Sequence, residues 1–164
     1  MIKNSIYIIL GSLFLMSPSY AVETGLHPAV LSSSALFERI TLSEKRLSEG
    51  IITVEEARGK LSKARFLNAL MHIFDSSKRQ QIVKDITELE VKLELLMTLS
   101  EQARTEVNAL KEVHRILSNN ESLPLRSKAQ DHLAQLASIS RNATSEGWIA
   151  FRMGEELRAA LGVS

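Results

Sequence analysis

A row of mostly apolar residues recurs in alternating steps of four and three between Ile82 and Leu117. This heptad spacing predicts one long helix with a coiled-coil-like face. Neighbouring apolar residues widen the stripe in the middle of the row, which favours a bundle of several helices over a two-stranded coiled coil. The row consists of Ile82, Ile86, Leu89, Leu93, Leu96, Ser100, Ala103, Val107, Leu110, His114 and Leu117.

Two shorter helices are expected before this long one. The first covers residues 35–49 and ends at Gly50, because glycine commonly follows the last turn of a helix. The second begins at Thr53, whose hydroxyl would form a capping box with Glu56. Residues 66–74 are apolar on most faces, so we expect them to be deeply buried.

A polar stretch over residues 75–81 separates these helices from the long one. Its side chains would cover every face of a helix, so we expect a tight turn near residues 75–77 that folds the chain into a hairpin. The alternative is one unbroken helix over residues 54–118, a rod about 100 Å long. The hairpin is favoured because it buries more apolar surface than the rod.

Turn-forming residues follow the long helix at positions 118–124. A fourth helix then carries apolar residues from Leu125 to Ile139 and ends near Arg141. Residues 142–147 form either a break or a bend, and a last helical segment follows from Trp148.

No segment alternates apolar and polar residues over a useful length, so strands are not expected. The predicted fold class is all-α: an antiparallel helical bundle of three to five helices, built on the one long coiled-coil-like helix. We expect a single domain over residues 35–164, preceded by an irregular arm over residues 22–34.

Residues 1–21 have the features of a cleavable signal peptide of the Sec type. Lys3 provides the positive start, an apolar run covers residues 6–16, and Ser19 and Ala21 occupy the small positions of a cleavage site. The run is shorter than the roughly 20 apolar residues of a membrane-spanning helix. We therefore expect cleavage after Ala21 and a periplasmic or secreted protein.

Composition narrows the classes of partner. The formal net charge is +1, whereas non-specific nucleic-acid binding needs a basic surplus, so no nucleic-acid partner is expected. The chain has no cysteine, which excludes disulfides and a lipid-anchored type of signal peptide. We also expect no stable membrane anchor once the signal peptide is removed.

Candidate chemistry is sparse. None of the four histidines lies three or four residues from another, so no helix presents a two-histidine metal site. His114 lies in the heptad row, where a neutral, hydrogen-bonded residue that fixes register is favoured over a metal ligand. Glu88, Glu90 and Glu94 lie close together, and a solvated charged face is favoured over a metal or proton site. We expect a non-enzymatic protein with no catalytic residue, no cofactor and no metal.

The last helical segment carries the candidate partner-binding residues Trp148, Phe151 and Met153. Trp148 and Phe151 fall beside its apolar stripe, as partner anchors do, although packing across the open end of the bundle is the favoured alternative. Together these features predict an accessory protein, adaptor or assembly factor of a bacterial envelope machine, such as a secretion or pilus system, that binds protein partners in the cell envelope. The alternative is a periplasmic chaperone or inhibitor of exported clients. Homo-oligomer formation is left open.

Overall fold

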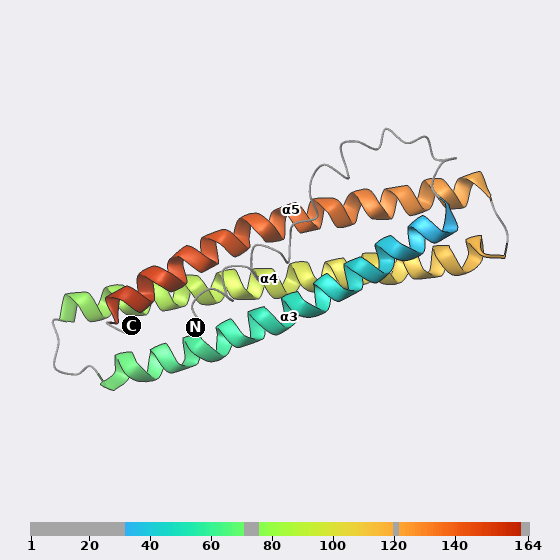
Figure 1. The fold of residues 1–164 in the computed structure, drawn as a ribbon. Coiled ribbons are helices and arrows are strands. Elements are labelled where there is room, and N and C mark those ends of the chain that lie inside the picture. Colours follow the sequence, from blue (N-terminus) through green and yellow to red (C-terminus); the bar gives the residue numbers. More distant parts are fainter. Residues whose placement is uncertain (1–31, 71–75, 120–121, 162–164) are drawn as a thin grey trace.

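The computed structural model describes residues 32–70, 76–119 and 122–161. Every regular element in these ranges is a helix: α3 covers Ser33–Leu70, α4 covers Ser76–Leu117 and α5 covers Leu123–Ala160. The helices lie side by side, and the colour order along each one shows that successive helices run in opposite directions (Figure 1). Helix α4 contacts both of the others. The described chain is therefore an all-α bundle of three long helices.

Helix α4 supplies the central row of the core. The large apolar members of its predicted row are buried, and Leu96 and Leu110 have almost no exposed surface. Ser100 is buried as well, and its hydroxyl donates to the carbonyl oxygen of Leu96 at 2.9 Å, so the helix itself satisfies this polar residue. Ala103 and His114 are half-buried. The heptad spacing thus predicted the buried face of α4 correctly.

Helix α3 is continuous, so the predicted helix end at Gly50 and the new start at Thr53 are wrong. Gly50 is buried and stands in line with a buried row that passes through α3 in steps of four and three. Thr53 lies inside the helix, where its hydroxyl donates to the carbonyl oxygen of Glu49 at 2.9 Å. Packing of this row against α4 outweighs the low helix propensity of one glycine, about 1 kcal/mol. The row contains Leu36, Ile40, Ser43, Leu47, Gly50, Val54, Ala57, Leu61, Ala64 and Asn68.

Helix α5 is also continuous, and the break or bend predicted at residues 142–147 does not occur. Ala143 and Gly147 are buried within this stretch, whereas Asn142 and Ser145 are exposed. The polar residues that suggested a loop therefore cover the solvent side of an ordinary helix. A buried residue recurs every seven positions along α5, at Ala129, Leu136, Ala143, Ala150 and Leu157.

The burial predicted for residues 66–74 is wrong at its start. Phe66 and Leu67 are exposed, whereas the polar residue Asn68 is buried. The buried row of α3 passes through Ala64 and Asn68, so Phe66 falls on the opposite side of the helix and Leu67 on the flank of the row. The rest of the apolar stretch, residues 71–74, lies outside the described residues.

The hairpin between α3 and α4 is confirmed, and the unbroken rod is excluded. Helix α3 ends at Leu70, α4 begins at Ser76, and the two helices pack against each other. Helix α3 begins at Ser33, slightly before the predicted residue 35. The predicted signal peptide at residues 1–21 and nearly all of the arm at residues 22–34 lie outside the described residues.

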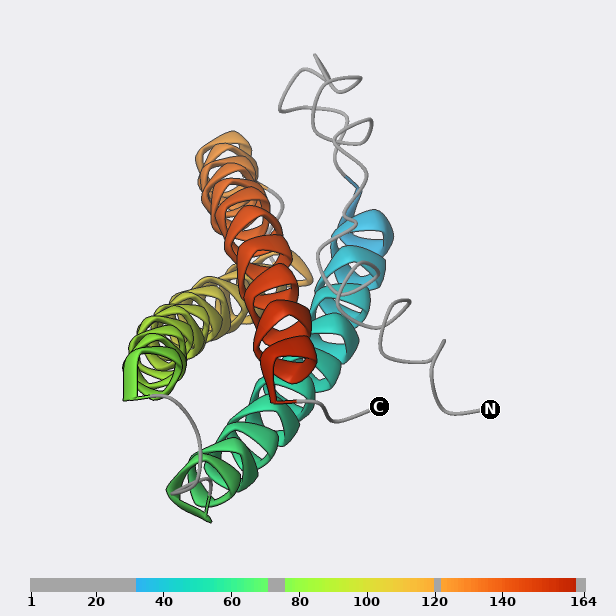
Figure 2. The same ribbon diagram turned by 90° about the vertical axis from the view of Figure 1, so that its left-hand side faces the viewer.

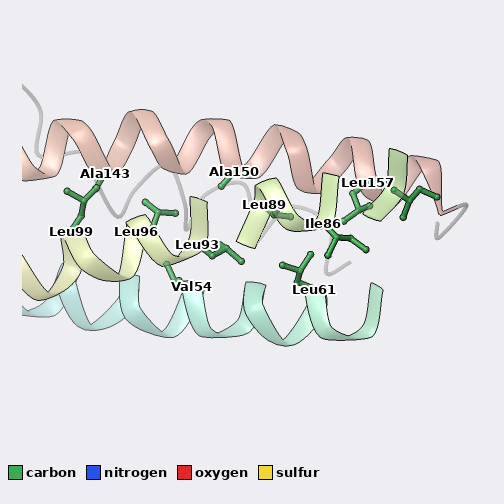
Figure 3. Packing of buried hydrophobic residues seen from close by; sticks show 11 residues of the cluster. Val54, Leu61, Ile86, Leu89, Leu93, Leu96, Leu99, Ala143, Ala150 and Leu157 are labelled. Atoms are coloured by element: carbon green, nitrogen blue, oxygen red, sulfur yellow. The ribbon is translucent and has the colours of Figure 1, made fainter. Parts of the chain in front are cut away.

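The core is divided into two clusters along the bundle. The first joins the C-terminal half of α3, the N-terminal half of α4 and the C-terminal half of α5 (Figure 3). The second joins the opposite ends of the same helices. Seen along the bundle, the three helices form a triangle rather than a flat layer, so both clusters lie between all three (Figure 2). Buried members of the second cluster are Leu36, Ile40, Val107, Leu110, Val113, Leu117, Ala129 and Leu136.

Charged pairs between helices share one register at each interface. Between α3 and α4, Glu44 pairs with Lys111 and Arg65 pairs with Glu90. Glu44 and Arg65 lie three heptads apart, and so do their partners on α4.

The same relation holds between α4 and α5. Lys92 Nζ lies 2.6 Å from Glu146 Oε2, and His132 Nδ1 lies 2.7 Å from Glu106 Oε2. The two residues on each helix are two heptads apart. Because whole-heptad spacing returns a residue to the same side of the core, these pairs fix the alignment of both neighbours on α4.

Candidate functional site

Two of the three predicted partner-binding residues lie together on α5. Trp148 is 54% exposed, and Phe151 stands one turn further along the helix and is half-buried. Their ring centroids are 5.9 Å apart and the rings are perpendicular, an edge-to-face arrangement that aromatic pairs favour. Trp148 does not pack across the end of the bundle, which was the favoured alternative. Its indole ring instead forms part of the outer surface.

Met153 does not join this aromatic pair. It packs against the first core cluster and is half-buried. Residues that are two positions apart in a helix point in directions that differ by about 200°. Phe151 and Met153 therefore lie on nearly opposite flanks of α5. Helical geometry could have separated them at the sequence level. The candidate surface therefore reduces to Trp148 and Phe151.

Arg152 completes the exposed face around Trp148. It lies four residues after Trp148, which places the two side chains on the same side of the helix, and it is exposed. No ion pair of Arg152 occurs among the described residues. We call Trp148, Phe151 and Arg152 the α5 surface. Tryptophan and arginine are the residue types most enriched among the energetically dominant residues of protein interfaces.

His114 has the structural surroundings that were expected of it. Its Nε2 atom lies 3.1 Å from the hydroxyl of Ser33 on the facing helix α3. The ring of Phe37, also on α3, lies 5.5 Å from the imidazole ring, centroid to centroid. His114 therefore links the start of α3 to the end of α4, and no second metal-ligating side chain is needed to account for its position.

The acidic cluster on α4 is divided among different contacts. Glu90 pairs with Arg65 of α3, and Glu88 lies 3.7 Å from Lys84 within α4. Glu94 is exposed. Within residues 32–70, 76–119 and 122–161, no group of three or more histidine, aspartate or glutamate side chains is placed to hold a metal ion. His27 and His72 lie outside these ranges.

A partly buried polar pair between His132 and Glu106 was not predicted from the sequence. A carboxylate only accepts hydrogen bonds, so the short contact to Glu106 assigns the proton to His132 Nδ1. The amide of Gln135 donates to the same carboxylate at 2.8 Å in the orientation that satisfies both groups. These three side chains join α5 to α4. They form a structural link, since Glu106 is already occupied by two donors from the protein.

A cavity of about 50 Å³ separates the two core clusters. All three helices line it: Ser43, Arg46, Leu47 and Gly50 from α3, Leu99, Ser100, Ala103 and Val107 from α4, and Leu136, Ile139 and Ser140 from α5. The sequence feature that could have predicted this cavity is the neighbouring pair of small residues, Ser100 and Ala103, in a row of otherwise bulky residues. The small residues Ser43 and Gly50 of α3 meet them at the same level.

None of the three described helices contains a stretch long and apolar enough to cross a membrane. The chain matches no known protein family, no curated protein and no solved structure.

Proposed function

We propose that this chain is an exported, non-enzymatic helical protein that acts by binding a protein partner in the bacterial cell envelope, as an adaptor or assembly factor of an envelope machine. The observation that carries the proposal is the exposed Trp148 on α5. About half of this large side chain is in water, and removing that apolar area from water would contribute strongly to binding.

The bundle is well suited to present this side chain. Trp148 projects from a helix that is held to α4 by the buried residues Ala143 and Ala150 on either side of it and by the Lys92–Glu146 pair. Because the backbone beneath the α5 surface is already ordered, binding would cost little conformational entropy. The coiled-coil-like heptad rows supply this rigidity.

The α5 surface defines the chemistry of the partner. Its aromatic pair fits an apolar pocket, and Arg152 beside it fits an acidic group at the rim of that pocket. The proposed partner is therefore a folded envelope protein with an apolar pocket and a neighbouring carboxylate.

The test uses the only tryptophan of the chain as both anchor and probe. The protein, with a photo-crosslinking amino acid in place of Ser145, an exposed residue one turn before Trp148, is used as bait in native envelope extract, and the crosslinked partner is identified and purified. Binding of that partner to the unmodified protein should shift the tryptophan emission to shorter wavelength. Trp148→Ala should weaken binding by at least about 2 kcal/mol, the level of a dominant interface residue.

Leu123→Ala is the matched control, because Leu123 is an exposed large apolar residue at the far end of α5. It should leave binding unchanged. Equal binding by Trp148→Ala and the unmodified protein would refute the α5 surface as the partner site. Crosslinking to many unrelated unfolded chains would favour the alternative, a chaperone for exported clients.

Export has its own test. Expression of the full chain in a bacterium, followed by fractionation and intact-mass measurement, should give a periplasmic protein that begins at Val22. A protein that keeps Met1 and remains with the membrane after a carbonate wash would contradict the proposed signal peptide.

A further inference from the structure

We propose that the cavity between the two core clusters binds the short aliphatic chain of a small carboxylate, with the carboxylate group held at the rim by Arg46. This site is distinct from the α5 surface and does not depend on the proposed function. Four observations support it: the position of the cavity, an unpaired buried hydroxyl, its size, and the charge at its edge.

The cavity lies where the rows of α3 and α4 carry small or polar residues at the same level. Ser43 and Gly50 of α3 stand at the level of Ser100 and Ala103 of α4. Leu99 belongs to the first core cluster, and Val107 and Leu136 belong to the second, so an apolar wall closes the cavity at both ends. The cavity therefore lies between two well-packed regions of the bundle, and it is open to solvent at its side.

The hydroxyl of Ser43 has no hydrogen-bond partner in the described protein. Ser43 is only 6% exposed and lines the cavity. A buried hydroxyl without a partner is destabilising, so native proteins rarely leave one unsatisfied. Ser100 faces the same space but donates to its own helix. The cavity thus has one unsatisfied polar group in a wall that is mostly apolar, which is typical of a ligand pocket.

The size of the cavity sets the length of the chain that fits. A water-sized group needs about 10–15 Å³ of such volume, so the roughly 50 Å³ present accepts about three to five carbon atoms. The matching ligands are short straight-chain carboxylates from butanoate to hexanoate. Aromatic acids, with six or more ring carbon atoms, exceed this volume.

The charge of the ligand follows from Arg46. This residue lies one turn after Ser43 on α3, lines the cavity and is half-buried. No ion pair of Arg46 occurs among the described residues. A guanidinium without a carboxylate partner at the mouth of an apolar cavity favours an anion, and its planar shape matches a carboxylate. The Ser43 hydroxyl is buried, and rotation about the Cα–Cβ bond brings it into the cavity, where it can donate a second hydrogen bond to the same group.

The test is a chain-length series measured by isothermal titration calorimetry on the purified protein. Sodium salts from ethanoate to octanoate are compared with the corresponding 1-alkanols and alkylammonium ions. Carboxylate affinity should rise about fourfold for each added methylene, because each buried methylene contributes a constant increment. The rise should stop at pentanoate or hexanoate, when the cavity is full. Alkylammonium ions should bind at least tenfold more weakly than carboxylates of equal length.

Three variants assign the site. Ala103→Leu adds three carbon atoms to the cavity wall and should abolish binding. Ala134→Leu, at an exposed position, is its control and should leave binding unchanged. Arg46→Gln should weaken carboxylates about tenfold without affecting 1-alkanols. Arg58→Gln, at an exposed arginine of the same helix, is its control. Ser43→Ala should weaken carboxylate binding about fivefold.

Unfolding curves of each variant, recorded alongside, show that the bundle is intact. The proposal is overturned if affinity keeps rising through octanoate, because adsorption to the surface has no length limit. It is equally overturned if Ala103→Leu folds normally and binds like the unmodified protein, or if no carboxylate of the series binds at millimolar concentration.

Discussion

Truncation of Leu96 to alanine tests the packing of the bundle at its centre. Leu96 is 1% exposed and lies in the first core cluster, in the row that α4 turns towards its two neighbours. Figure 3 shows its side chain between α4 and α5, at the level of Ala143. Its neighbour in the sequence, Leu95, is 38% exposed. The same substitution at both positions removes the same atoms from the same helix, and only their burial differs.

The expected cost follows from that difference in burial. Leucine to alanine removes three carbon atoms, worth about 2.4 kcal/mol if each is fully buried. At Leu96 the vacated space is enclosed by other helices, and the cavity left behind raises the cost to about 3–4 kcal/mol. At Leu95 only part of the side chain is removed from water and no enclosed cavity forms. The expected cost there is about 1–1.5 kcal/mol, reduced slightly by the higher helix propensity of alanine.

Urea unfolding followed by circular dichroism measures both free energies of unfolding on one scale. We expect Leu96→Ala to lose about 1.5–3 kcal/mol more than Leu95→Ala, with unchanged urea dependence. Equal losses at the two positions would refute the buried face assigned to α4. A loss below about 0.5 kcal/mol at Leu96 would place that residue in solvent and contradict the bundle itself.

Three further predictions concern separate features. Gly59→Ala should raise the free energy of unfolding by about 0.5–1 kcal/mol, because alanine favours the helix and its Cβ would meet no atom within 4 Å; a destabilised variant in urea unfolding would contradict this. Exchange of the charges of Lys92 and Glu146 should restore most of the stability lost in either single variant, with a coupling of about 0.5–1 kcal/mol in a double-mutant cycle, and zero coupling would exclude a role in alignment. The hydrogen bonds from Arg115 lower the pKa of Glu112 below its usual value. Any stability that this pair provides is therefore present above the usual pKa of a glutamate and lost as the pH falls through the lowered one, and a carboxyl NMR titration should show the pKa rising in Arg115→Gln.

The sequence predicted α4 well because nothing interrupts its apolar row. Leucine, isoleucine and valine occupy most of the buried positions, and the two polar positions fit the spacing without a slip. The rows on α3 and α5 follow equally regular spacing, but small and polar residues such as Ser43, Gly50 and Ala143 take many of their positions. A search for large apolar residues detects such rows only in fragments, which is why α3 and α5 were each divided in two.

The predicted helix ends were also wrong because they were inferred from residues with low helix propensity, which describes helices in isolation. Gly50 and the polar residues 142–147 are weak helix formers, yet both stretches lie in the middle of helices that pack along α4. Tertiary packing overrides propensity when a continuous buried face is available. The reversal of the chain between α3 and α4 was predicted correctly, since residues 75–81 offer no residue for a buried face, but Ser76 and Ser77, which were expected in the turn, belong to α4.

The candidate surface could be predicted in part. The spacing of Trp148 and Phe151 places them one turn apart in any helix, and the structure has them in contact. Exposure of Trp148 depends on which side of α5 meets α4, and this side is set by the buried heptad row of alanines and leucines. The Ser33–His114 contact and the pairs between helices depend on the alignment of helices that are far apart in sequence, so no single segment contains them.

The small residues of the rows have two different structural consequences. On α5, alanine at three of the five heptad positions lets its backbone approach α4 closely, and the first core cluster closes around Ala143 and Ala150. At the level of Ser43 and Ala103, small residues from two helices face each other, and closer approach is blocked because the bulky clusters on both sides hold the helices apart. The cavity therefore follows from the alignment that the charged pairs fix. Ala103→Leu fills the cavity with its side chain, which should both stabilise the bundle and abolish ligand binding. This one variant therefore connects the stability of the fold to the chemistry of the site.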